Sequence, residues 1–368
     1  MVITRNLSTF VLWNIEIECF EHLIFGRQID MSTNKGFDYE QAEKENPLYP
    51  VDECCSHIEM VIDDSIIRLY HSIDNFIFQD IDYSRVISNM PQWVADGGIS
   101  PELNCTKDWY EALRRKVTHP IFGRFIYHYD LWSKIAAMQD RLSAVVMFMH
   151  QLYTIVPCKA IYEEFQYTSA ARCGGARETE AHILLNSVFV AYASVFDILT
   201  KISIEQFEFH KYDFSEYKKM RSSDIIYRKS LNNIDSSLKK EGMLFAEPPI
   251  IRKIETFRNE FVHNGPWDLR CSVYNTAVNG EPADVIIYSP DMDDIGNFIS
   301  SGSRNKFYSQ ANRINILLPD MIKEATIVVN KTINQLSTLY QAATIRSADE
   351  NYTQECLNAI MDYNDSLK

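Results

Sequence analysis

The strongest constraint on the fold is the segment from Glu180 to Ile202, because it is apolar on nearly every face that a helix would present. It reads EAHILLNSVFVAYASVFDILTKI and is interrupted by Asn186, Ser194 and Asp197. A helix that is apolar all round has to be covered by neighbouring elements on most of its sides. The segment therefore predicts a central, buried helix. Its polar residues need partners when buried, so they would either bond the next helix or face a functional site.

Apolar residues recur at helical spacing elsewhere in the chain, and they predict the helices that cover this segment. In the N-terminal half, helices are expected from His57 to Asp82, from Asp108 to Val117 and from Asp130 to Tyr153. In the C-terminal half, we expect a more exposed, polar helix over residues 213–240 and a final long helix from Arg313 to Tyr340. Pro319 either kinks that last helix or marks its first turn.

Two regions show the alternation of apolar and polar residues that is typical of strands. Residues 8–20 alternate at Trp13, Ile15, Ile17 and Cys19, which predicts a strand near the N-terminus. Cys271–Ala277 and Asp284–Ser289 flank the sequence VNGEPA, and this arrangement predicts a β-hairpin with its turn at Asn279-Gly280.

The predicted fold class is mainly α, with a β-hairpin inserted in the C-terminal half. A chain of 368 residues exceeds the usual single-domain size. The sequence SAARCGGARETE, residues 169–180, separates two helical regions. We predict a mostly helical N-terminal domain over residues 1–170, a helical domain over 176–346 and a tail over 347–368 with at most a short helix. The paired glycines of the break are interpreted as a linker, since a phosphate-binding loop would need a preceding strand and a P-loop lysine.

Charge and cysteine usage narrow the range of functions. The net charge is -14, whereas proteins that coat nucleic acid without specificity usually present a basic face. Any RNA site must therefore be local, or be assembled with a partner. The eight cysteines form no C-x-x-C pair, and Cys54, Cys55 and His57 lack a second half for a metal site. We expect reduced, structural thiols and no bound metal or cofactor.

The N-terminal sequence does not have the features of a secretory signal. Asn14 and the acidic residues that follow interrupt its apolar run, and no A-x-A cleavage pattern comes after it. Elsewhere the chain lacks a continuous apolar run of the roughly 18 residues that a membrane span requires. These observations predict a cytoplasmic protein that does not associate with membranes.

The segment from Pro249 to Trp267, PIIRKIETFRNEFVHNGPW, carries the residues on which a function can be based. Its apolar residues recur at helical spacing and predict one buried stripe on an amphipathic helix; they are Ile250, Ile254, Phe257 and Phe261. The helix should end at Asn264-Gly265, because Pro266 cannot continue it. Arg258, Asn259 and His263 then lie in its last two turns.

The run RNEFVH, which closes this helix before Asn-Gly, resembles the Arg-x4-6-His signature of the HEPN superfamily. The resemblance covers about residues 176–346 and implies a HEPN-like helical bundle, in which the segment from Glu180 would be the long first helix. The same spacing occurs from Arg114 to His119 and from Arg177 to His182. The first of these lacks the Asn and ends at a proline, and the second straddles a predicted helix start. Context therefore favours the match at Arg258.

The resemblance implies a metal-independent ribonuclease in which Arg258 and His263 are catalytic and Asn259 orients the histidine or contacts phosphate. Histidine suits proton transfer because its ordinary pKa is about 6.5. The planar fork of arginine can bind phosphate oxygens bidentately. At about 100° per residue, Arg258 lies roughly 140° around the helix from His263. Unless the last turn relaxes at Gly265, the two converge only across a homodimer, which the resemblance also implies.

Three functional hypotheses follow. The first is a HEPN-type endoribonuclease, of the toxin or antiviral-defence kind, that acts on RNA as a homodimer. The second is a catalytically silent HEPN-like module for binding or dimerisation, which the acidic net charge favours. The third is nucleotide binding in the same groove. A helical scaffold can host any of these functions, so the fold alone does not decide between them.

Overall fold

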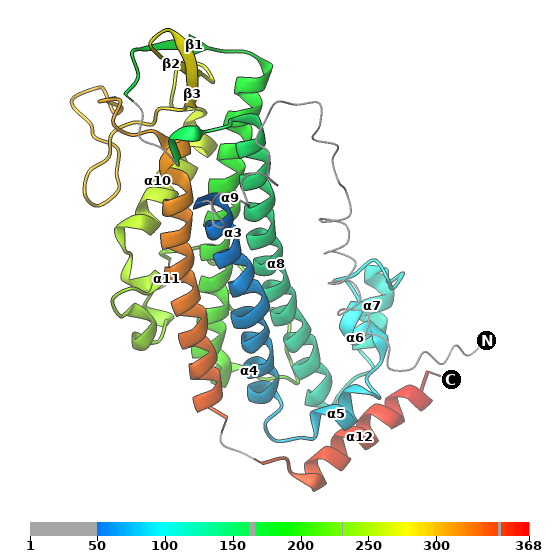
Figure 1. Ribbon diagram of the computed structural model, residues 1–368. Coiled ribbons are helices and arrows are strands. Elements are labelled where there is room, and N and C mark those ends of the chain that lie inside the picture. The colour runs from blue at the N-terminus through cyan, green and yellow to red at the C-terminus, as the bar shows by residue number, and fades with distance from the viewer. Residues whose placement is uncertain (1–49, 162–165, 230, 345–346, 368) are drawn as a thin grey trace.

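The computed structural model describes residues 50–161, 166–229, 231–344 and 347–367 (Figure 1). The strand expected over residues 8–20 lies outside these ranges. Within them the chain is mainly helical and carries a small antiparallel sheet of three strands. The predicted fold class, mainly α with an inserted hairpin, is confirmed.

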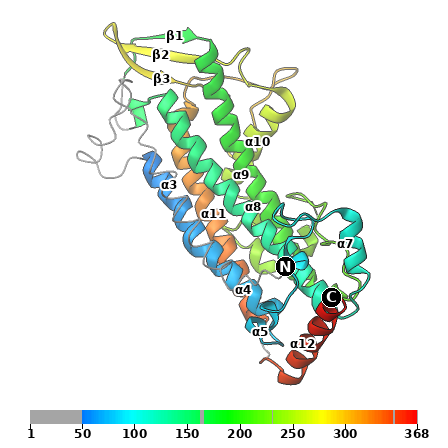
Figure 2. The ribbon, with the colours of Figure 1, turned by 90° about the vertical axis from the view of Figure 1, so that its right-hand side faces the viewer.

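Long helical segments lie lengthwise beside one another and form the body of the molecule (Figures 1 and 2). In chain order they are α3 (Pro50–Met60), which continues through a π-helical turn (Val61–Ile66) into α4 (Ile67–Ile77), then α8 (Pro120–Ile155), α9 (Ala176–Glu208) and α11 (Ile314–Ala342). A shorter helix, α10 (Pro249–Asn264), packs on α9. Hydrogen bonds from Ser65 to Asn330 (2.6 Å) and from Arg68 to Asn334 (3.2 Å) tie the N-terminal segment to α11.

The predicted central helix is confirmed as α9. It packs against α8, α10 and α11, and buried residues recur along it from Ala181 to Glu205. By length and composition α9 could also cross a bilayer, since its most apolar 18-residue window has a mean hydropathy of 1.8. In this fold, however, 61% of that window is buried inside the protein. The apolar surface is thus largely used for packing, as in a core helix.

The helix α8 starts ten residues before the Asp130 start that the sequence suggested. Pro120 occupies its first turn, where a missing N–H costs nothing. The Nδ1 atom of His119 accepts a hydrogen bond from the Ile121 N–H at 3.2 Å and so caps the helix. Shorter helices connect α4 to α8: α5 (Tyr83–Ile87), α6 (Gln92–Asp96) and α7 (Lys107–Arg114), the last of which confirms the helix expected near Asp108.

The predicted hairpin is confirmed, and a third strand joins it. β2 (Val273–Val278) pairs with β3 (Glu281–Ile286), and the turn residues Asn279 and Gly280 have φ values of 53° and 87°. Both values lie in the left-handed region that two-residue hairpin turns require. β1 (Ser169–Cys173) pairs antiparallel with β2, so the stretch interpreted as a linker is an edge strand. Its small, largely exposed residues lack the apolar alternation that indicates a strand.

The prediction of an exposed helix over residues 213–240 is wrong. The described part of that region contains turns and short 3-10 segments, Leu231–Asn233 and Ser236–Lys239. Two carboxylates of α9 hold the region in place. Glu205 accepts a hydrogen bond from the Ser222 N–H at 2.8 Å, and Asp197 accepts one from the Tyr227 N–H at 2.7 Å. Backbone groups that bond a neighbouring helix in this way are not used for a helix of their own.

The C-terminal end is more helical than predicted. α11 continues through Pro319, which lies inside the helix. The expected tail forms α12 (Glu350–Asp365), which begins where Asp349 accepts hydrogen bonds from the Asn351 and Tyr352 N–H groups. α12 packs through Tyr363, whose ring contacts Phe122 and Trp93. The tail is therefore a docked helix of 16 residues.

One hydrophobic cluster of the described residues draws side chains from both sides of residues 170–176. α8 packs along α9, and α11 contacts α3 and α4 as well as α9. The division into 1–170 and 176–346 remains a prediction about folding units, and separating the two halves would expose the shared cluster.

Candidate functional site

The signature residues lie at the C-terminal end of α10, near the end of the bundle that carries the sheet (Figures 1 and 2). Pro249 occupies the first turn of this helix, as prolines commonly do. The helix ends at Asn264 because Gly265 adopts a φ of 86° and Pro266 follows. The boundaries predicted for this helix are confirmed.

Two sides of α10 are covered by the rest of the protein. Its apolar stripe packs on α9, where the ring of Phe257 stacks on that of Phe189 with centroids 4.8 Å apart. The loop of residues 290–312 covers a second side. There the Thr256 hydroxyl donates a hydrogen bond to the Gly296 carbonyl at 2.8 Å, and the ring of Phe298 contacts Phe257. Near the C-terminal end of the helix, Asn259, Val262 and His263 lie on the remaining surface and are exposed.

The signature side chains are accessible and are not tied into the fold. Asn259 and His263 are exposed, and Arg258 is half-buried. The Arg258 guanidinium donates a hydrogen bond from Nη1 to the Asn259 Oδ1 at 2.8 Å. In the described part of the chain, neither Arg258 nor His263 forms an ion pair. Both side chains are thus accessible to an outside group.

A single chain does not bring Arg258 and His263 together. α10 remains α-helical through Asn264, so the last turn does not relax before the histidine. At about 100° per residue, the two side chains leave the helix roughly 140° apart, with the exposed Val262 between them. Among the described residues no hydrogen bond joins them. One helix therefore presents the two groups on either side of an exposed strip.

A buried carboxylate that the sequence analysis did not single out fixes the end of α10. Glu260 lies within the signature itself and is 6% exposed. It accepts a hydrogen bond from the Asn264 Nδ2 at 2.9 Å and forms an ion pair with Lys306 of the covering loop. Carboxylates are rarely buried unless they are paired. The ion pair and the hydrogen bond of Glu260 therefore explain its burial by a structural role.

The two competing Arg-x4-His matches are used to build the fold. His119 caps α8, and its Nε2 lies 3.5 Å from the Glu355 Oε1. The Arg177 guanidinium donates a hydrogen bond to the Ile155 carbonyl at 2.8 Å. His182 is buried, donates from Nε2 to the Ser272 carbonyl at 2.9 Å, and has a pKa that burial lowers. These contacts distinguish both matches from the exposed one at His263.

The polar residues of α9 serve mainly as anchors. The Ser194 hydroxyl donates to the Val190 carbonyl of its own helix at 2.8 Å, and Asp197 binds the Tyr227 N–H. The Asn186 Oδ1 is buried and has no hydrogen-bond partner among the described residues. Two of the three residues therefore have a structural role, and Asn186 is the exception.

A cluster of charges lies one turn before the signature. Arg228, whose φ of 68° is left-handed, pairs with Glu255 at 2.7 Å and approaches Glu247 to 3.8 Å. Burial raises the pKa of the Glu255 carboxyl, and the Arg228 guanidinium opposes that rise. Arg252 also pairs with Glu247, at 3.7 Å. These pairs fasten the segment around Arg228 to α10.

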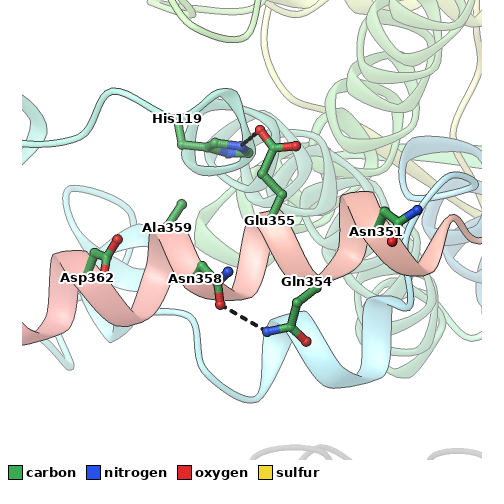
Figure 3. A pocket seen from close by; sticks show the side chains of 7 residues that line it. All are labelled: His119, Asn351, Gln354, Glu355, Asn358, Ala359 and Asp362. Carbon is green, nitrogen blue, oxygen red and sulfur yellow. Dashed lines mark hydrogen bonds and ion pairs between the residues drawn. The ribbon is translucent and has the colours of Figure 1, made fainter.

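An open, polar depression of about 470 Å³ lies near the opposite end of the molecule, between α12 and the start of α8 (Figure 3). It is lined by His119, Asn351, Gln354, Glu355, Asn358, Ala359 and Asp362. Gln354 donates a hydrogen bond to Asn358 at 3.0 Å along the exposed side of α12. The sequence analysis missed this depression because it expected only a tail there. None of its residues belongs to the signature at Arg258.

In the part of the chain that is described, no group of three or more His, Cys, Asp or Glu side chains is arranged to hold a metal ion. Comparisons with protein-family models, with curated proteins and with solved structures find no match to this chain.

Proposed function

We propose that this protein is a metal-independent endoribonuclease of the HEPN type that acts on RNA as a homodimer. The observation that carries the proposal is the placement of Arg258, Asn259 and His263. They lie at the C-terminal end of α10, accessible to solvent and without intrachain ion pairs in the described residues. Side chains that are exposed and carry no ion pair of their own are free to contact a ligand or a second protomer.

The chemistry assigns one role to each side chain. His263 moves a proton at the 2′-hydroxyl or at the leaving oxygen, because histidine is the side chain most often used for general acid–base catalysis. Arg258 stabilises the charge on the phosphate oxygens through its bidentate fork. Asn259, which accepts the Arg258 hydrogen bond, keeps the guanidinium directed along the exposed face of the helix.

A homodimer supplies the convergence that a single helix lacks. Two antiparallel copies of the α10 end would bring Arg258 of one protomer towards His263 of its partner. A second arginine beside the phosphate would also offset the negative end of the helix dipole, which by itself repels an anion. The exposed Val262, 48% accessible between the two catalytic groups, provides apolar surface for such a contact.

The alternative is a catalytically silent HEPN-like module for binding or dimerisation. The separation of Arg258 and His263 favours it, because a protein that stays monomeric would not assemble the site. The net charge of -14 also favours it, since it weakens general affinity for RNA. The two functions differ in one testable respect, namely whether His263 is required for RNA to be cleaved.

The direct experiment is incubation of the purified protein with total RNA in EDTA, beside the His263→Ala variant. Fragments that form with the parent protein and fail to form with the variant support the ribonuclease. Cleavage that EDTA abolishes and magnesium restores would contradict the metal-independent mechanism. Intact RNA in every lane, together with a stable dimer, would favour the silent module.

A further inference from the structure

The loop of residues 301–312, SGSRNKFYSQAN, combines cations with aromatic side chains beside the signature helix. Phe307 is 40% exposed and Tyr308 is 41% exposed. Arg304 is exposed as well and forms no ion pair in the described part of the chain. The net charge of the chain is -14, so a nucleic-acid site in it has to be local, and an unpaired arginine beside exposed aromatic rings is one feature that such a site requires.

This loop is anchored next to the catalytic candidates. Lys306 pairs with the buried Glu260, which lies one turn before His263. The Tyr308 hydroxyl donates a hydrogen bond to the Trp267 carbonyl at 2.5 Å, just beyond the end of α10. Asp291 accepts hydrogen bonds from the Ser309 N–H and hydroxyl at 2.8 and 2.7 Å. Three anchors in four residues give the loop a fixed shape before any ligand arrives, which lowers the entropic cost of binding.

The orientation of Tyr308 is informative. An exposed tyrosine commonly keeps its hydroxyl in water, whereas here the hydroxyl is turned inward onto a backbone carbonyl. Burial raises the pKa of this hydroxyl to about 12, so it stays protonated and able to donate. Because the hydroxyl is already hydrogen-bonded, we expect the aromatic ring to provide much of the exposed surface of Tyr308. A rigid, exposed ring is what a nucleobase needs for stacking.

We infer that Phe307 and Tyr308, together with Arg304, form a base-stacking subsite that holds an unpaired nucleotide of the RNA beside His263. This inference rests on the proposed ribonuclease function and adds the residues that position its substrate. Arg304 contacts the phosphate next to the stacked base, and the two rings accept the base itself. Stacking does not depend on hydrogen bonds to base edges, so the subsite tolerates any base.

The preceding part of the 290–312 loop carries carboxylates, and two of the three, Asp291 and Asp293, are already bonded. The Asp291 carboxylate accepts hydrogen bonds from Ser309 and from the Asn312 Nδ2, the latter at 2.8 Å. Asp293 accepts hydrogen bonds from the Ile295 and Asn297 N–H groups at 3.1 and 2.7 Å, in the turn that contacts α10. These two carboxylates bind groups of the loop itself, whereas Arg304, Phe307 and Tyr308 are exposed.

The test uses the full chain carrying His263→Ala, so that binding is measured without cleavage. Two fluorescein-labelled probes of equal length are compared by anisotropy, an oligouridylate and the same ribose-phosphate chain without bases. Phe307→Ala and Tyr308→Ala should each weaken binding of the oligouridylate about ten-fold, within the range of one stacked base. Neither should change binding of the abasic chain. Phe307→Leu, which keeps the apolar volume and removes the π face, should behave like Phe307→Ala.

Trp109→Ala is the matched control, because Trp109 is 42% exposed on α7 and lies in a different part of the molecule. It should leave both probes unaffected. The inference is overturned if the loop variants weaken both probes equally or neither, or if they only turn a dimer into a monomer. Failure of the proposed function looks different: RNA cleavage would be independent of Arg258 and His263, while base-dependent binding could still be lost in Phe307→Ala.

Discussion

Glu260 and Lys306 form an ion pair that fastens the 290–312 loop across the last turn of α10, with the Glu260 side chain 7% and the Lys306 side chain 23% exposed. The pair lies between the catalytic candidates on one element and the exposed aromatics on the other. It therefore connects two features that are at least 44 residues apart in sequence, the separation of His263 from Phe307, and it makes the loop part of the same surface.

Removing this pair should loosen the loop and lower stability. Glu260→Ala deletes a buried acceptor used by Asn264 and Lys306, so we expect a loss of about 1–3 kcal/mol in the free energy of unfolding. Glu102→Ala, at an exposed loop position, is the control and should change little. Chemical denaturation measures both. Equal, small effects would mean that the pair does not hold the helix end.

Gly296 tests how closely the loop packs on α10. Its φ is 92°, and a Cβ added there would lie 2.9 Å from both the Lys253 N and the Pro249 O atoms. Gly296→Ala should therefore cost about 2–4 kcal/mol, from left-handed strain together with a forced backbone shift. Gly302→Ala is the matched control. The φ of Gly302 is also positive, at 57°, but no atom would lie within 4 Å of a Cβ added there. That substitution should cost about 1–2 kcal/mol. Indistinguishable melting temperatures would contradict the close approach.

The buried His182 predicts a pH dependence of stability. Burial lowers its pKa in the folded protein, whereas the unfolded chain binds a proton with a pKa of about 6.5. The unfolded state thus holds more protons below that value, and the free energy of unfolding should fall between about pH 7 and pH 5. His182→Gln keeps a donor for the Ser272 carbonyl and should make the slope shallower by up to about 1.4 kcal/mol per pH unit.

Part of the slope should remain in that variant, because burial also lowers the pKa of His128, although Asp74 opposes the shift. Measurements above pH 7 give the cost of the substitution itself. An unchanged slope would mean that His182 accepts a proton in the folded state as readily as in the unfolded chain.

Local signals in the sequence were sufficient to predict α9, α10 and the hairpin. α9 is apolar all round, α10 has a proline start and an Asn-Gly-Pro stop, and the hairpin has its Asn-Gly turn. The elements that were missed depend on distant contacts. β1 is a strand because β2 provides its partner, and the region of residues 213–240 is irregular because Glu205 and Asp197 bind its backbone.

The same distinction applies to the candidate site. Arg258, Asn259 and His263 could be selected from their spacing and their position at a helix end. The Glu260–Lys306 pair and the anchored Tyr308 could not, because they join α10 to a loop whose path follows from tertiary packing. A loop without periodicity carries little information about where it will lie.

A shared site makes a prediction about mixed dimers. Arg258→Ala and His263→Ala should each be inactive alone, yet mixing them after subunit exchange should restore roughly a quarter of the parent activity. Half of the dimers are then mixed, and each of these has one intact site of two. The assay is RNA cleavage in EDTA against the mixing ratio. No recovery despite demonstrated exchange would mean that both residues of a site come from one chain.

The most direct measurement compares RNA cleavage rates in EDTA for two matched pairs of variants. Arg258→Ala should lower the rate about 10²- to 10³-fold, and His263→Ala about 10²- to 10⁴-fold, without a large fall in melting temperature. The control pair, Arg114→Ala and His119→Ala, has the same spacing but lies in the elements that build the fold. It should cleave at nearly the parent rate below its melting temperature. Cleavage that survives in Arg258→Ala and His263→Ala but is lost in the control pair would contradict the assignment of the site to α10.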